Sequence, residues 1–284
     1  MKNNRGVFND LNTDAEFKKE GFVVFDEEIA ELTINHFRDK MNTLSPSDGF
    51  KAGQKTFIPE QSYHCTFFDS NLEYRKDVWN LMSEFFGGFI DRELSKYKLI
   101  QANIFIKPPG TGYVYPHQNL TVVDEAYYSS LSLWCPLQDT GISNGTMQVV
   151  PGSQKQFELY RNADIYWPLL EIFENDGKEL LQSLEVKKGS IVVLDDSIIH
   201  GTPVNQASES RVVFHAMLIP IEASPIFCDL DNRQESVKVY EVKDDFWQFH
   251  IPGKKPVFQN PVKVEPYVKN QYRYNRQKKV LEQF

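Results

Sequence analysis

Cysteine is scarce in this chain of 284 residues, which has only three, widely spaced along the sequence. An odd and scattered set does not form a disulfide framework or a cysteine-rich zinc site, so we expect buried free thiols. The first ten residues lack the apolar run of a signal peptide, and no later run approaches the roughly 18 apolar residues that cross a bilayer. We therefore expect a soluble, cytoplasmic protein with no part in the membrane.

Positive charge is also in short supply. The chain has 31 Lys and Arg against 39 Asp and Glu, a net charge of −8 at pH 7. Without a Lys/Arg-rich run there is no basic face to neutralise a phosphate backbone, which argues against a nucleic-acid partner. Aromatic side chains, in contrast, are plentiful, with 21 Phe and 13 Tyr. Strands favour such residues, and the length suffices for one large domain.

The order of apolar runs and turn signals predicts a mainly β protein. Turn-bounded apolar runs predict strands at 98–107, 130–137, 145–153, 190–196 and 211–220. Residues 14–43 predict an opening strand and helix, with further helices at 75–94 and 165–183 and a long loop at 44–70. Short strands separated by turns are typical of a sandwich or closed barrel.

Two other parts of the chain carry weaker signals. Lys107 and the Pro-Pro-Gly that follows predict a turn, and Asp195 and Asp196 are expected to cap a strand without a metal role. In the polar tail beyond residue 222, the segment DDFWQFHIPGKKP is expected to pack on the core. The final segment, QYRYNRQKKVLEQF, predicts a loose helix.

Two histidines lie in segments that suggest metal chemistry. His117 lies in YPHQN at 115–119, and His200 lies in IIHGTPVNQASESR further along the chain. Non-haem iron oxygenases hold Fe(II) with two histidines and one carboxylate on one face, which leaves positions open for a co-substrate and oxygen. The first histidine and the carboxylate usually lie two residues apart. An isolated H-x-N would mean little, so the flanking sequence decides the interpretation.

The flanking sequence resembles the phytanoyl-CoA dioxygenase-like family of Fe(II)/2-oxoglutarate oxygenases. The likeness covers roughly residues 15–222, and its motifs are FIKPPGTGYVYPHQN (105–119), SLWCPLQDTGISNGTMQVVPGSQK (132–155), KKGSIVVLDDSIIHGT (187–202) and Arg211. It implies flanking helices around a double-stranded β-helix, the jelly-roll or cupin-like core. We expect a single domain over 1–284, with its core at 15–222 and a C-terminal extension at 223–284.

The resemblance also implies cofactors and site residues. Fe(II) would be the metal, 2-oxoglutarate and O2 the co-substrates, and a small molecule the substrate. His117 and His200 match the two metal histidines. Arg211 matches the arginine that binds the distal carboxylate of 2-oxoglutarate, a task that suits its planar fork. Further expected contacts to 2-oxoglutarate are Thr202, Trp134, Gln101 and Asn103, and the candidates for substrate contact are Gln118 and His64.

One position departs from the family pattern, because Asn119 stands where the carboxylate ligand is expected. Asparagine is nearly isosteric with aspartate but neutral, so iron would lose a compensating charge. Asp124 and Glu125 follow in the next loop, at a spacing that does not suit the usual turn. The open interpretations are an oxygenase with Asn119 as a neutral ligand, a catalytically silent ligand-binding relative, an engineered change, and, less favoured, a halogenase in which halide replaces the carboxylate.

Overall fold

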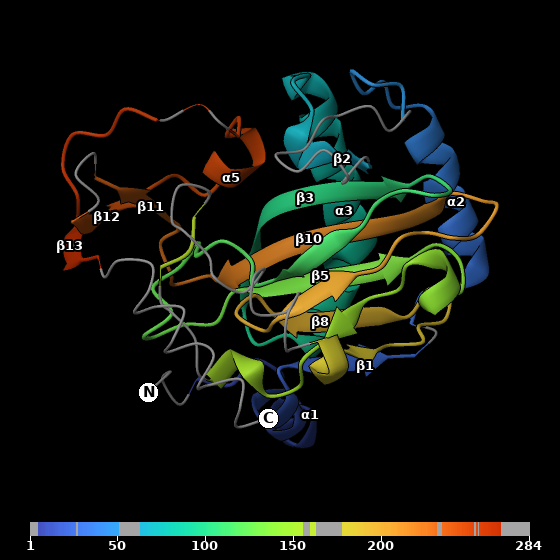
Figure 1. The fold of residues 1–284 in the computed structure, drawn as a ribbon, viewed down its shortest axis with the longest axis horizontal. Helices are drawn as coiled ribbons and strands as arrows, with labels where there is room; N and C mark the ends of the chain where they lie inside the picture. Colours follow the sequence, from blue (N-terminus) through green and yellow to red (C-terminus); the bar gives the residue numbers. More distant parts are fainter. Residues whose placement is uncertain are drawn as a thin grey trace.

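The computed structural model describes residues 5–26, 28–50, 63–155, 160–162, 178–231, 235–252, 254 and 256–267. Its core contains two antiparallel sheets (Figure 1). The larger has the order β1-β8-β5-β10-β3-β2, and the smaller has the order β4-β9-β6-β7. The strands of the larger sheet are β1 (Phe22–Phe25), β2 (His64–Cys65), β3 (Tyr97–Lys107), β5 (Leu131–Pro136), β8 (Ile191–Asp195) and β10 (Arg211–Pro220). Those of the smaller are β4 (Val114–His117), β6 (Gln148–Val149), β7 (Gln182–Ser183) and β9 (His200–Thr202).

Side-chain alternation gives the larger sheet two different faces. Successive residues of a strand point to opposite faces, so odd and even positions separate. On β10, Phe214 and Ala216 belong to the main hydrophobic core, while Arg211 and His215 line a cavity on the other face. The strands β3 and β5 follow the same rule, and this sorting brings polar side chains together inside the fold.

Helices cover the apolar face of the larger sheet. They are α1 (Leu11–Glu20), α2 (Glu31–Asn42) and α3 (Leu72–Glu93), which Figure 1 shows with α2 and α3 on one side of the sheet. Asn71 caps the start of α3 by accepting from the backbone N–H groups of Glu73 and Tyr74, as N-cap residues commonly do. The ring of Phe85 on α3 contacts that of Phe214 on β10 edge to face, with centroids 5.1 Å apart.

The C-terminal region adds a separate three-stranded sheet and a short helix. The sheet joins β11 (Ile226–Leu230), β12 (Ser236–Glu241) and β13 (Lys263–Pro266), and α5 spans Phe246–Phe249. Short 3-10 turns complete the fold at η1 (Thr66–Phe68), η2 (Ile142–Asn144), η3 (Ser153–Lys155) and η5 (Lys178–Leu180). In the described residues, no helix combines the length and apolar character needed to cross a membrane.

Side chains from distant segments complete the outer edge of β3, where β2 pairs with only two residues. The backbone N–H of Ala102 donates to Oε1 of Gln248 at 2.7 Å, and that of Ile104 donates to Oγ1 of Thr66 at 3.0 Å. Gln101 also reaches α5, donating to the carbonyl of Trp247. The expectation that DDFWQFHIPGKKP packs on the core is therefore confirmed for α5.

The jelly-roll class and the long strands are confirmed, whereas several local predictions were wrong. The helix α1 was missed, although Asp10 caps its start and Gly21, at φ 85°, ends it in the left-handed region that glycine favours. Of the strand predicted at 145–153, only Gln148–Val149 pairs. Of the helix predicted at 165–183, residues 165–177 lie outside the described part, and the rest includes η5 and β7. The loop predicted at 44–70 contains β2 and η1, and the final segment lies outside the described residues.

Candidate metal centre

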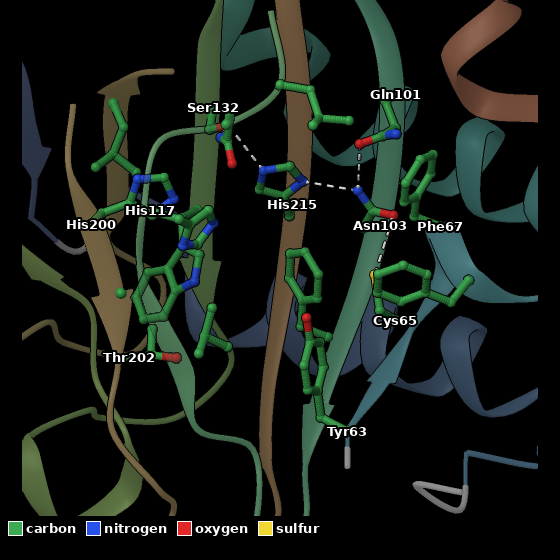
Figure 2. A pocket seen from close by; sticks show the side chains of 18 of the residues that line it. Tyr63, Cys65, Phe67, Gln101, Asn103, His117, Ser132, His200, Thr202 and His215 are labelled. Atoms are coloured by element: carbon green, nitrogen blue, oxygen red, sulfur yellow. Dashed lines mark hydrogen bonds between the residues drawn. The ribbon is translucent and has the colours of Figure 1, made fainter. Parts of the chain in front are cut away.

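Strand pairing places the two candidate metal histidines side by side. His117 ends β4, His200 begins β9, and the two residues are direct partners in the antiparallel ladder. Their ring centroids lie 4.3 Å apart (Figure 2). Residues far apart in the sequence therefore present two imidazoles at one point on the wall of the cavity.

Hydrogen bonds to backbone carbonyls set the tautomer of both rings. Nδ1 of His117 lies 2.8 Å from the carbonyl of Tyr115, and Nδ1 of His200 lies 3.0 Å from that of Ile198. A carbonyl only accepts, so each Nδ1 carries the proton and each Nε2 carries a lone pair. Burial lowers the pKa of both rings, that of His200 to about 3, and keeps them neutral. Neutral imidazoles with oriented Nε2 lone pairs are the form that binds metals.

Asn119 follows His117 by two residues and is held firmly. Its backbone N–H donates to the carbonyl of Asp196 at 2.9 Å. Its Nδ2 donates to Oδ1 of Asp196 at 2.7 Å and to Oγ of Ser132 at 3.1 Å, and its side chain also contacts His117. The residue that replaces the expected carboxylate is therefore anchored beside the histidine pair.

No carboxylate in the described residues joins the histidine pair. The single group there with three or more closely spaced ligating side chains is Asp48, His64 and Asp69, which includes neither His117 nor His200. Glu125 forms a buried ion pair with Arg161 at 2.5 Å. The nearest acid along the hydrogen-bond network is Asp196, which is fully buried and whose pKa is raised to about 6 by burial, against hydrogen bonds from Ser132 and Asn119.

Two buried cations stand together at the other end of the cavity wall. Arg211 begins β10 and Lys107 ends β3, and the two are direct partners in the ladder. Nζ of Lys107 donates to Oγ1 of Thr202 and, at 3.1 Å, to the carbonyl of Pro203. Arg211 donates to the carbonyl of Gly145, and its Nε is buried without a partner. Burial lowers the pKa of Arg211 to about 9 and, together with Arg211, lowers that of Lys107.

These cations have no acidic partner among the described residues. Burying charge without a counter-ion is costly, so the pair indicates a site for an anionic ligand. The turn predicted at Lys107 and the Pro-Pro-Gly forms just after Lys107, with Thr111 N–H donating to the carbonyl of Pro108, whereas Lys107 itself is the last residue of β3, as in the strand predicted at 98–107, and lines the cavity. The signal was available, since Gln101, Asn103 and Lys107 share one parity along the strand.

The other predicted co-substrate residues surround the same cavity of about 340 Å³. Trp134 lies below Arg211, whose Cζ is 5.5 Å from the ring centroid. Asn103 donates to Nδ1 of His215 at 3.2 Å and to Oε1 of Gln101 at 3.1 Å, so both amides belong to a network on the sheet floor (Figure 2). His215, which sequence analysis assigned no role, is the centre of that network.

The two predicted substrate residues have different positions. Gln118 lines the cavity and donates to the carbonyl of Ser197 at 2.6 Å. His64 does not line it, because the ring is fully buried between Asp48, at 2.8 Å from Nδ1, and the hydroxyl of Tyr74, at 2.8 Å from Nε2. Both nitrogens of His64 have partners, so the prediction that it contacts substrate does not fit the structure.

Buried histidines make the stability of the metal-free protein depend on pH. Burial lowers the pKa of His215 to about 3, below its unfolded value near 6.5. The stability this group contributes is complete above about pH 6.5 and is lost as pH falls toward 3, because the unfolded chain takes up the proton first. The unfolding free energy of the wild-type protein should fall as the pH is lowered from 6.5 to 4. In His215→Gln we expect this fall to be less steep, by up to about 1.4 kcal/mol per pH unit. Urea unfolding measures this, and the exposed His36→Gln is the control; equal slopes for all three proteins would contradict it.

The ion pair between Arg161 and Glu125 supports the loop that carries Asn119. Nε of Arg161 donates to the carbonyl of Asn119 at 2.7 Å. Removing one partner of a buried pair costs roughly 3 to 5 kcal/mol, because a charge stays buried without its counter-ion. We expect Glu125→Gln to lower the unfolding free energy by that amount in chemical denaturation. Asp139→Asn, at the exposed pair with Lys187, is the control and should change it by less than about 1 kcal/mol; equal effects of the two changes would contradict the prediction.

Comparison with known proteins follows this geometry. The sequence model of the phytanoyl-CoA dioxygenase (PhyH) family matches residues 17–213. A phytanoyl-CoA dioxygenase of Arabidopsis thaliana is 30% identical over 116 residues, which are 40% of this chain and 41% of that protein. A phytanoyl-CoA dioxygenase domain-containing protein 1 homolog of Dictyostelium discoideum is 27% identical over 138 residues, 46% and 49% of the two chains. The matched segments thus span less than half of these relatives.

Solved structures share the fold at low sequence identity. HygX from Streptomyces hygroscopicus, with nickel, 2-oxoglutarate and hygromycin B bound, has a TM-score of 0.52 and 16% identity, over 75% of this chain and 88% of its own. SnoK, a non-heme alpha ketoglutarate dependent carbocyclase from nogalamycin biosynthesis, has a TM-score of 0.52 and 16% identity, over 76% and 86%. At this identity the likeness establishes the fold.

Proposed function

Because the chain belongs to the phytanoyl-CoA dioxygenase family, we propose that it is an Fe(II)- and 2-oxoglutarate-dependent oxygenase of a small molecule. One observation carries the proposal. A single cavity has a neutral histidine pair on one wall and two buried cations without acid partners among the described residues on another. The first suits a divalent metal and the second suits the far carboxylate of a dicarboxylic acid.

The donor set fits iron. His117 and His200 would hold it through Nε2, and the side-chain oxygen of Asn119 would be the third protein ligand. Bound iron would supply the activation of O2 with electrons from 2-oxoglutarate, which leaves as succinate and CO2. The protein's part is to fix the two rings in one tautomer and to keep them unprotonated by burial.

The cation pair fits 2-oxoglutarate. Arg211 would meet the distal carboxylate with its planar fork, and Lys107 and Thr202 would complete the contacts. Thr202 and His200 lie two residues apart on β9, so both face the cavity at a separation of about 7 Å along the strand. That span suits an extended five-carbon diacid with its keto-acid end at the histidines. Trp134 closes this end of the cavity beneath Arg211.

The remaining end of the cavity is the place for substrate. Its lining is largely aromatic, with Phe67, Phe68 and Trp247, and the amides of Gln101 and Gln118 provide hydrogen-bonding groups nearby. Binding sites for small molecules commonly combine an apolar wall with a few placed polar groups. The acidic chain has no basic patch evident in its sequence for a CoA phosphate. We therefore propose an amino acid, a peptide or another natural-product intermediate as substrate.

The hydrogen bonds of Asn119 bear on the competing interpretations. A halogenase needs space beside the metal for halide, whereas Asn119 is held in place by Asp196 and Ser132. The proposal is tested by loading the protein with Fe(II) without oxygen, adding 2-oxoglutarate and air, and measuring succinate. We expect succinate above the background set by His117→Ala. Binding of 2-oxoglutarate without any succinate would instead indicate a silent ligand-binding relative.

A further inference from the structure

A chain of hydrogen bonds runs across the larger sheet from Asn103 through His215 to Ser132, as Figure 2 shows, and continues from Ser132 to Asp196. Nδ2 of Asn103 donates to Nδ1 of His215, which must therefore carry a lone pair. The proton of neutral His215 then lies on Nε2, which donates to Oγ of Ser132 at 3.1 Å. The hydroxyl of Ser132 in turn donates to Oδ1 of Asp196 at 2.6 Å. Every donor in the chain points the same way, and Asp196 is the final acceptor.

This direction determines which way the Asn119 amide turns. A carboxylate accepts and does not donate, so the atom of Asn119 that faces Asp196 must be Nδ2. Its two protons are used on Asp196 and Ser132. The atom of Asn119 that contacts His117 is therefore the amide oxygen.

The amide oxygen of Asn119 therefore lies beside the ring of His117, whose Nδ1 is bonded to the carbonyl of Tyr115. The network thus places an oxygen donor next to the histidine pair, where it can serve as a ligand to a divalent metal ion.

We propose that Asp196 is a positioning residue of the metal centre, which turns the amide oxygen of Asn119 toward the histidine pair. The inference rests on the proposed function and deepens it. Asp196 does not line the cavity and does not group with His117 and His200 as a ligating cluster, so it acts through Asn119. The carboxylate that the family pattern places on the metal stands here one hydrogen bond away. The centre is a His–Asn–His donor set for a divalent cation.

The experiment measures Mn(II) binding by calorimetry, without 2-oxoglutarate, together with the melting temperature of the metal-free protein. Asp196→Ala is expected to weaken Mn(II) binding by about 10- to 100-fold, the usual cost of losing a group that orients a ligand. Asp196→Asn keeps an acceptor oxygen and should recover part of that loss. The matched control is Asp195→Asn, because Asp195 is a buried neighbouring carboxylate that accepts from Ser197 and Ser129. It should change the melting temperature and leave Mn(II) affinity unaltered.

A second variant, in which the two side chains are exchanged, tests the proposal even if Asp196→Ala fails to fold. Asn119→Asp with Asp196→Asn keeps the same groups with their places exchanged, and should bind Mn(II) at least as tightly as wild type. Asn119→Asp alone should bind more weakly than the exchange variant, because two carboxylates would meet at a buried contact now 2.7 Å long.

Each contrary result has a distinct meaning. Equal Mn(II) affinity in wild type, Asp196→Ala and Asp195→Asn would overturn the positioning role while leaving the oxygenase proposal intact. A larger loss in Asp196→Ala than in Asn119→Ala would make Asp196 itself the ligand, and would also overturn it. Failure of the wild-type protein to bind any divalent metal would instead remove the proposed function on which the inference rests.

Discussion

Arg211→Leu is expected to raise the KM for 2-oxoglutarate by roughly 30-fold or more. Truncating one partner of a buried, hydrogen-bonded charge pair costs about 2 to 5 kcal/mol, and 1.4 kcal/mol corresponds to a factor of ten. Arg211 is 3% exposed and has no acid partner in the described structure, so an anionic ligand would supply the missing counter-ion. Succinate formation at varied 2-oxoglutarate measures the change.

The melting temperature of the ligand-free protein separates this role from a structural one. A leucine at 211 removes a buried charge that lies opposite Lys107, and like charges directly opposite on paired strands are destabilising. The ligand-free variant should therefore melt no lower than wild type, while its stabilisation by 2-oxoglutarate should disappear. Arg92→Leu, at an exposed position on α3, is the control. A large drop in the melting temperature without 2-oxoglutarate, with KM unchanged, would show that Arg211 serves the fold.

His200→Ala is expected to weaken divalent-metal binding by more than 100-fold. Loss of a group that merely orients a ligand costs 10- to 100-fold, so loss of the ligand itself should cost more. Removing the imidazole also removes a buried neutral ring from beside His117, and no described carboxylate is placed to substitute. Calorimetric titration with Mn(II) measures the affinity. His36→Ala, on the exposed face of α2, should bind as wild type does, and near-wild-type affinity in His200→Ala would rule out the histidine pair as the centre.

The sequence predicted those parts of the fold that depend on local pattern. The strands β3, β5, β8 and β10 and the helix α3 are long or strongly apolar, so their periodicity is clear. The strands β4, β6 and β9 are short, and their pairing is set by contacts between distant segments. His117 and His200 were identifiable from their flanking motifs. Their direct pairing across two short strands was not, because no local signal encodes it.

The hydrogen-bond network that runs from Asn103 to Asp196 could not be predicted from the sequence for a similar reason. Asp196 was expected to cap a strand, and His215 is one residue in an apolar run. The hydrogen bonds that link them depend on registers such as His215 against Trp134 and Asn103, which align the polar positions of three strands. A sequence shows the parity of each strand, but the alignment of one strand with the next is a property of the folded sheet.

The edge of β3 has a consequence for how the protein is made. The backbone N–H of Ala102, in the middle of that strand, finds its hydrogen-bond acceptor in Gln248, which lies 146 residues further along the chain. An uncovered strand edge is a template for pairing with another chain. During synthesis this edge of β3 therefore stays uncovered until the segment that carries α5 has left the ribosome. We therefore expect a chain that ends before Gln248 to leave this strand edge uncovered and to self-associate more readily than the full chain.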